Sequence, residues 1–290
     1  MTWTTYLTED EQAVLKEIQD WVHQPPSVLS KALVLAGKPA ELAYRLIPAG
    51  VKESLGNAIY GVLGTVRDTS RTTVSRRDIL DKISARLGKD VGTTPDQIFA
   101  AEVKSLDPLA IECINFNKRA AAVEGGAAGA VGLPGLVADV PALYLLAFRT
   151  IQEVAICYGF PVEGPDEHAY MMKVLDVGHY LENEKKRAGM EQLQSLEEMI
   201  RQGAPLKDLE RVSLAKGLQA LARELSVALA RRKMAQSVAL VGSIVGAGVN
   251  FALVNDVGLT AFYAYRYRFL HEVAQRRMKR RAVFQSSEEV

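Results

Sequence analysis

Apolar side chains recur along this chain at intervals of three and four residues, the spacing of helices that bury one face. Thr8 and Glu11 have the spacing of a capping box, and apolar positions then share one helical face until Pro25 and Pro26. Sustained two-residue alternation, the mark of a half-buried strand, is not found. The pattern predicts further helices over 27–36, 40–47 and 51–66. Another helix is predicted to begin after Thr73 or Ser75 and to run to about Leu87, where Gly88 can end it. Thr94-Pro95-Asp96 marks the start of one more helix.

The second half continues the helical pattern after glycine and proline positions at 159–165. Residues 166–199 read as two polar helices, and leucines from 214 to 225 predict a long amphipathic helix. Because no stretch resembles a linker, we expect an all-α fold in a single domain over 1–290. Within it we distinguish an N-terminal helical part of about 1–100, a core of about 101–282 and a disordered tail at 283–290.

Two apolar windows, 125–148 and 237–265, interrupt the polar background. Their 53 positions hold nine of the 22 glycines and only two charges, Asp139 and Asp256, whereas the overall charged fraction of 24% would give about 13. Each window has a glycine-rich arm, an Asp-Val pair, an aromatic-rich arm, and an arginine ten residues after the aspartate. This layout predicts two pseudo-repeated glycine-rich helical hairpins packed centrally in the domain.

The two aspartates have two interpretations. As helix N-caps they would accept the free N–H groups of the second arm. As a carboxylate pair brought together by the repeat, they could bind a cation or share a proton. Arg149 and Glu153, four residues apart, could equally form an ion pair. The candidate catalytic residues are Asp139, Asp256, Glu153 and Glu272.

The windows also raise the question of membrane contact. Residues 237–255 are 19 uncharged positions, close to the ~20 that span a bilayer, but glycine, serine and asparagine dilute them. Basic residues flank both windows on both sides, which favours a hairpin that dips into the interface and returns. The alternative is that both hairpins are the buried centre of a soluble domain. The residues expected to contact lipid are Gly125, Gly129, Leu133, Leu136, Gly242, Gly246, Phe251, Arg276, Arg277, Lys279, Arg280 and Arg281.

Charge is distributed unevenly. The 35 basic and 34 acidic residues sum to +1, yet residues 231–281 alone carry +8, which leaves −7 on the rest. A basic section of this kind suits an anionic membrane surface, and no aromatic and basic motif of an RNA-binding module accompanies it, so nucleic acid is not an expected partner. The first residues lack the basic start and apolar run of a secretory signal, and Cys113 and Cys157 form no CxxC pair. We expect a cytoplasmic protein, peripheral to the inner face of the cytoplasmic membrane.

The motifs that would indicate an enzyme do not occur: the sequence has no HExxH, GxSxG or GxxxxGK[ST]. Asp20 with His23, and Asp176 with His179, could share helical faces as metal ligands, but exposed polar residues on amphipathic helices are the favoured interpretation. The sequence therefore predicts no metal and no cofactor, and an enzyme is the less favoured class.

Three segments resemble the EcsC family: NFNKRAAAVEGGAAG at 115–129, GLVADVPAL at 135–143 and RTIQEVAICYG at 149–159. GAGVN at 246–250 and RYRFL at 266–270 are similar to the C-terminal part of that family. The family is mainly bacterial, and its namesake gene lies beside the genes of an ATP-binding cassette transporter. The resemblance thus implies work at the cytoplasmic membrane, with a membrane transporter as a partner.

These observations predict a helical protein that associates peripherally with membrane or lipid and is an accessory to a membrane or transport system. Two alternatives stay open: a soluble carrier of an apolar ligand, and a carboxylate- or metal-dependent hydrolase. The oligomeric state is left open as well.

Overall fold

A computed structural model describes residues 3–24, 48–68, 74–91, 95–129, 133–180, 182–213, 221–223, 225–227, 229 and 242–288. Every regular element in these ranges is a helix, which confirms the all-α prediction. The elements are the 3-10 helix η1 (Trp3–Tyr6) and the α-helices α1 (Glu9–His23), α4 (Ala49–Asp68), α5 (Arg76–Leu87), α6 (Pro95–Ile98), α7 (Val103–Gly129), α8 (Leu133–Cys157), α9 (Pro165–Gly178), α10 (Asn183–Arg201), α11 (Leu206–Ser213) and α13 (Gly242–Glu288).

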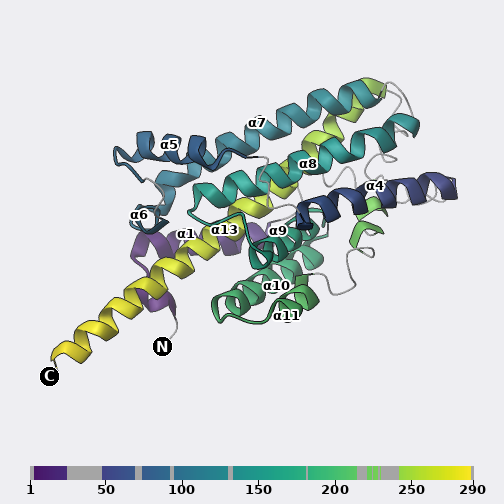
Figure 1. The fold of residues 1–290 in the computed structure, drawn as a ribbon. Coiled ribbons are helices and arrows are strands. Elements are labelled where there is room, and N and C mark those ends of the chain that lie inside the picture. The colour runs from purple at the N-terminus through teal and green to yellow at the C-terminus, as the bar shows by residue number, and fades with distance from the viewer. Residues whose placement is uncertain are drawn as a thin grey trace.

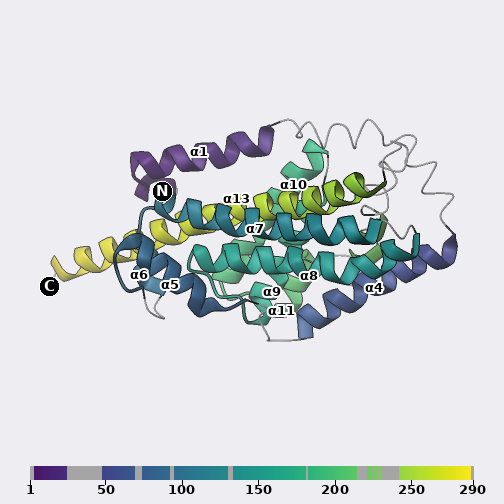
Figure 2. The ribbon, with the colours of Figure 1, turned by 90° about the horizontal axis from the view of Figure 1, so that it is seen from above.

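The fold is organised around α13. This helix has 47 residues and is therefore about 70 Å long. It packs against η1, α1, α7, α8, α9 and α10, so that most elements of the described structure contact it. Its C-terminal end projects beyond the other helices in both views (Figures 1 and 2).

Helices α7 and α8 run side by side along α13 (Figures 1 and 2). The end of α7 and the starts of α8 and α13 lie together at the end of the molecule opposite the projecting end of α13. The second arms of both apolar windows supply part of the core, in which Tyr144 and Phe148 of α8 and Tyr265 of α13 are fully buried. In their described parts, these windows are therefore the centre of the helical fold.

Local capping signals are confirmed. Thr8 accepts a hydrogen bond from the Glu11 N–H while the Glu11 carboxylate accepts one from the Thr8 N–H. Ser75 caps α5, and Gly88 ends it in the left-handed conformation with φ +62°. These interactions involve neighbours in sequence, which is why sequence alone predicts them.

The hairpin prediction needs correction at both aspartates. Asp139 and Asp256 lie inside α8 and α13, so neither caps a second arm. From Gly242 onward the second window is one continuous helix, because packing against α7, α8 and α9 supports it on both sides of Asp256. In the first window, α7 ends at Gly129 and α8 begins at Leu133, and these two helices pack against each other. The C-terminal helix also continues through Glu288, where the sequence predicts a disordered tail.

Helix α9 also differs from expectation. It reads as polar, yet every residue from Glu167 to Gly178 is buried. Its polar groups are satisfied inside the fold, for example by the 2.8 Å ion pair between Lys173 and Asp176. His179, expected on an exposed face, is buried and lies 2.9 Å from the Tyr144 hydroxyl. The predicted helices at 27–36 and 40–47, and most of the one from 214, lie outside the described residues.

Candidate functional site

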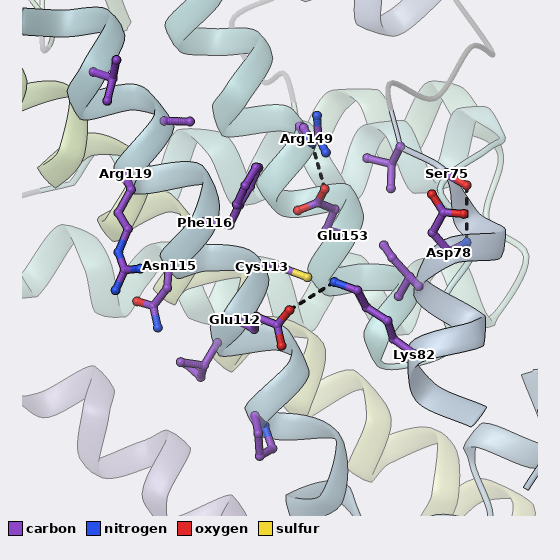
Figure 3. A pocket seen from close by; sticks show the side chains of 16 residues that line it. Ser75, Asp78, Lys82, Glu112, Cys113, Asn115, Phe116, Arg119, Arg149 and Glu153 are labelled. Carbon is purple, nitrogen blue, oxygen red and sulfur yellow. Dashed lines mark hydrogen bonds and ion pairs between the residues drawn. The ribbon is translucent and has the colours of Figure 1, made fainter. Parts of the chain in front are cut away.

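A groove with a volume of about 1090 Å³ opens between α5, α7 and α8 (Figure 3). One wall comes from α5 with Asp78 and Lys82, and another comes from the outer face of α7. Arg149 and Glu153 reach it from α8. We call this feature the α5–α7–α8 groove.

The register of α7 decides which side chains line the groove. Leu106, Ala110, Asn117 and Ala121 are buried against the rest of the fold at helical spacing. Phe116 and Val123, seven residues apart, consequently share the outer face, where they are 62% and 76% exposed. On α8, Leu145 is 39% exposed, one turn before Arg149. Large apolar side chains thus stand in solvent along one side of the α7–α8 pair.

The charged groups of the groove are mostly paired. Lys82 donates a 3.1 Å hydrogen bond to Glu112, which raises the pKa of Lys82. Arg149 and Glu153 form a 2.8 Å ion pair one helical turn apart. Arg119, between Phe116 and Val123, is exposed and makes no ion pair with any residue that the structure describes. Arg119 on α7 and the exposed Asp78 on α5 are thus the charged lining residues for which no ion pair is formed within the described ranges.

Glu153 is held in a buried hydrogen-bond network. Asn117 Nδ2 donates to Glu153 Oε2 at 2.6 Å and to the Cys113 carbonyl at 3.1 Å. The Arg149 guanidinium, which donates to the other carboxylate oxygen, also lies 6.0 Å from the centre of the Phe116 ring. Both oxygens of Glu153 thus have fixed partners, as in a structural ion pair.

The Cys157 thiol is not activated as a nucleophile. Burial and the neighbouring Cys113 raise the pKa of the Cys157 thiol well above its usual value. The thiolate is the reactive form, so a thiol with a raised pKa is a poor nucleophile at neutral pH.

Among the candidate catalytic carboxylates whose side chains the structure describes, Glu153 lines the groove and Asp256 and Glu272 do not. Glu153 pairs with Arg149, and Glu272 pairs with Arg276 at 2.6 Å. Asp256 lies in the middle of α13, and the side chain of Asp139 is outside the described residues. Glu153 thus adopts the ion-pair alternative, and Glu272 is also held in an ion pair.

The second copy of the predicted repeat also has different partners. Arg266, the counterpart of Arg149, pairs with Asp107 at 2.9 Å and with Glu17 at 3.0 Å. Tyr158 donates a 2.7 Å hydrogen bond to the other oxygen of Asp107. Burial raises the pKa of Asp107, and the charge of Arg266 opposes this. The two arginines are therefore not equivalent in structure.

The residues expected to contact lipid divide into two groups at opposite ends of α13. The first group surrounds the starts of α8 and α13: Gly125, Gly129, Leu133, Leu136, Gly242, Gly246 and Phe251. Gly125 is buried and Phe251 is half-buried, with the Lys118 ammonium 5.1 Å from its ring centre. The side chains of Leu133 and Leu136 lie outside the described residues. The basic group begins at Arg276, about 45 Å along the helix from Gly246.

The basic group is only partly available. Arg276 pairs with Glu272 and Asp96, and Arg277 pairs with Glu11 at 2.5 Å. Lys279, Arg280 and Arg281 are exposed on the projecting end of α13 and form no ion pair with any described residue. Two of the five cations thus stabilise the fold, and three face solvent.

Phe116, Arg119 and Val123 were not among the predicted contact residues. Their signal is present in the sequence: they fall opposite the buried stripe of α7, where an amphipathic helix normally carries polar residues. The predicted lipid contacts were instead placed in the glycine-rich windows and in the basic residues 276–281.

One segment among the described residues, Val140–Cys157, is long and apolar enough to cross a membrane, but 72% of it is buried within the protein. Its place in the core accounts for its apolar character.

The class that emerges is an all-α protein built around one long helix, with an amphipathic groove along the α7–α8 pair. The sequence profile of the EcsC protein family matches residues 12–270, and the chain belongs to this family. It is similar to the uncharacterized protein YdbA of Bacillus subtilis (strain 168), with 24% identity over 264 residues, covering 91% of this chain and 94% of YdbA. No solved structure matches.

Proposed function

We propose that this protein attaches peripherally to an anionic membrane surface through the outer face of the α7–α8 pair, as an accessory to a membrane system such as a transporter. The observation that carries the proposal is the exposure of Phe116 and Val123 at 62% and 76%, with Arg119, which forms no ion pair with a described residue, between them in the sequence.

Apolar exposure supports contact with lipid. Scattered exposed apolar residues are ordinary, but Phe116 and Val123 share one helical face and both line the same groove. An aromatic ring beside arginine side chains suits the headgroup region, where rings and basic groups are both stabilised. Arg149, with its guanidinium 6.0 Å from the Phe116 ring centre, adds a second cation on the same side.

Burial of the apolar segments favours attachment of the protein to the membrane surface over a helix that crosses the membrane. The Val140–Cys157 segment is largely covered by other helices, so insertion across a bilayer would require the core to open. An interfacial position needs no such change. Charge selects the lipid, since each arginine near an anionic surface gains on the order of 1 kcal/mol.

Flotation with vesicles tests the proposal. We expect the purified chain to float with vesicles containing phosphatidylglycerol at low salt and to remain at the bottom with phosphatidylcholine alone. Phe116→Ser and Val123→Ser should each weaken binding on the order of tenfold, because each removes an apolar contact worth about 1.5 kcal/mol. Leu206→Ser is the matched control, since Leu206 is 40% exposed on α11, outside the groove.

Substitution of basic residues tests which face of the protein binds the membrane. Arg119→Gln should weaken binding about fivefold, the equivalent of ~1 kcal/mol. If the triple change Lys279→Gln, Arg280→Gln and Arg281→Gln abolishes binding while Arg119→Gln and Phe116→Ser have no effect, then the projecting end of α13 makes the attachment and the proposed face is wrong.

The volume of the groove favours a second candidate, a soluble carrier of an amphipathic ligand. About 1090 Å³ with apolar and charged walls is enough for a small lipid. Mass spectrometry of an organic extract would detect a co-purifying amphiphile. A protein that carries one and fails to float with anionic vesicles would replace the membrane proposal with the carrier.

A further inference from the structure

A second cluster of polar side chains lies between α10 and α13, on residues that the groove does not use. Glu197 and Glu198 come from α10, and His271 and Gln275 come from α13. His271, Glu197 and Gln275 are buried, with exposed fractions of 4%, 6% and 7%. Glu198 is half-buried and opens the cluster to solvent. The Trp3 ring of η1 covers His271, with 4.8 Å between ring centres.

The hydrogen bonds define the protonation of His271. Its Nδ1 lies 2.7 Å from Glu197 Oε2, and because a carboxylate only accepts, Nδ1 carries the proton. Its Nε2 lies 3.2 Å from the Gln275 amide nitrogen, which can only donate, so Nε2 presents its lone pair. An imidazole with a carboxylate on one nitrogen and its second nitrogen turned toward other polar side chains is the arrangement of histidines that bind metals.

Gln275 supplies the second observation. Its amide oxygen is buried and has no hydrogen-bond partner among the described residues, while its amide group points at His271. A buried amide oxygen without a partner is unfavourable by about 1–3 kcal/mol. Half a turn of the amide exchanges its oxygen and nitrogen, which places the oxygen lone pairs beside Nε2. Two neighbouring lone pairs repel unless a proton or a cation lies between them.

Glu198 completes the set. Its Oε2 lies 4.0 Å from His271 Nε2, and ligand atoms of Glu197, Glu198 and His271 all lie within 4.8 Å of one another. Two atoms that bind one zinc ion at ~2.0–2.2 Å are about 3–4 Å apart, so small side-chain movements suffice. Arg201 donates a 3.0 Å hydrogen bond to the Glu198 carboxylate and so helps to fix its position.

We propose that His271 Nε2, Glu198 and Gln275 Oε1 bind a first-row divalent cation of the Zn²⁺ type, with Glu197 fixing the orientation of the imidazole. One nitrogen and two oxygen ligands suit such an ion better than Mg²⁺ or Ca²⁺, which prefer oxygen alone. The ion joins α10 to α13 beneath η1. The proposal is independent of the membrane proposal, because it uses neither the groove nor the projecting basic residues.

The test is titration of the EDTA-treated full chain with Zn²⁺ in a calorimeter. We expect one site per chain, and we expect Zn²⁺ to raise the melting temperature, since a ligand that binds the folded state stabilises it. Glu198→Gln should weaken Zn²⁺ binding roughly tenfold or more. Because Glu198 is half-buried on a helix surface, this variant should fold, and circular dichroism checks that it does. Glu191→Gln, an exposed position on the same helix, is the matched control.

Fluorescence provides a local readout. Co²⁺ should quench Trp3, whose ring centre is 4.8 Å from that of His271, in a Trp21→Phe variant that leaves Trp3 as the single tryptophan. His271→Gln should abolish this quenching. The proposal is overturned if the wild-type chain binds no Zn²⁺, or if Glu198→Gln and His271→Gln bind it with unchanged affinity, because the ion would then lie elsewhere.

Discussion

Arg268 and Glu167 face each other across the contact between α13 and α9. Two parallel hydrogen bonds of 2.7 and 2.8 Å join the guanidinium to the carboxylate, and each side chain is only 5% exposed. The rings of Phe160 and Tyr170 cover the guanidinium, each with its centre 4.3 Å away. A charge buried so deeply is tolerable only while its partner is present.

Removal of one partner should therefore be costly. Glu167→Gln leaves Arg268 buried without a counter-ion, and we expect a loss of about 3–5 kcal/mol in the free energy of unfolding, measured by urea denaturation. Asp20→Asn, which removes an exposed pair with Lys16, should change the same quantity by no more than ~0.5 kcal/mol. Equal effects of the two substitutions would contradict this reading of the buried pair.

The stability of the fold should also depend on pH through the ionisation of Glu11. Burial alone would raise the pKa of Glu11, but hydrogen bonds from Arg277 and Thr8 outweigh it and lower the pKa below the usual 4.5. A carboxyl whose pKa is lower in the folded chain stabilises the fold above pH 4.5, and this contribution disappears as the pH falls through the folded-state pKa. Glu11→Gln should thus lower stability at pH 7 and flatten its decline below pH 4.5. Thermal melts from pH 3 to pH 7 measure both effects, and a parallel decline in variant and wild type would count against the ion pair.

Gly178 marks a close approach of two helices. A Cβ atom there would lie 2.7 Å from Val257 Cα on α13. Gly178→Ala should push α9 from α13 and lower the free energy of unfolding by about 1–3 kcal/mol. Gly56→Ala on α4 is the control, because nothing lies within 4 Å of its Cβ position, and there alanine should stabilise the helix by roughly 0.5–1 kcal/mol. Chemical denaturation that gives the same sign for both variants would show that the close approach is absent.

The start of α5 should depend on Ser75, whose hydroxyl accepts a hydrogen bond from the Asp78 N–H. Ser75→Ala should lower the free energy of unfolding by about 1 kcal/mol, and Ser75→Asp should restore most of it because aspartate also caps helices. Hydrogen exchange of the first turn of α5 localises the effect. Equal exchange rates in the wild type and both Ser75 variants would mean that the Ser75 cap does not stabilise the start of α5.

Much of the fold follows from neighbours along the chain. The capping box at Thr8 and Glu11, the end of α1 before Pro25 and the left-handed Gly88 all depend on residues within one helical turn. The pairing of Arg149 with Glu153 was one of two sequence alternatives, since both partners share a helix face. The family, too, was identified from continuous segments of sequence, and the profile match over 12–270 confirms it.

The helix boundary predicted at Asp256 does not form, and tertiary packing is the reason. A carboxylate before an apolar arm is a good N-cap, but α13 packs against α7, α8 and α9 and continues through this position. The same packing buries α9, whose polar sequence predicted an exposed helix, by providing Arg268 for Glu167 about a hundred residues away in sequence.

The chain by itself determined the helical class, the local caps and the family, because these depend on residue spacing within a few turns. Only the tertiary structure decided which groups far apart in the sequence come into contact. Arg266 contacts Asp107, and His271 contacts Glu197, although these pairs are 159 and 74 residues apart in the sequence. The physical reason is that burial of a charge or an apolar face depends on what packs against it, and sequence periodicity describes only one of the two packed surfaces.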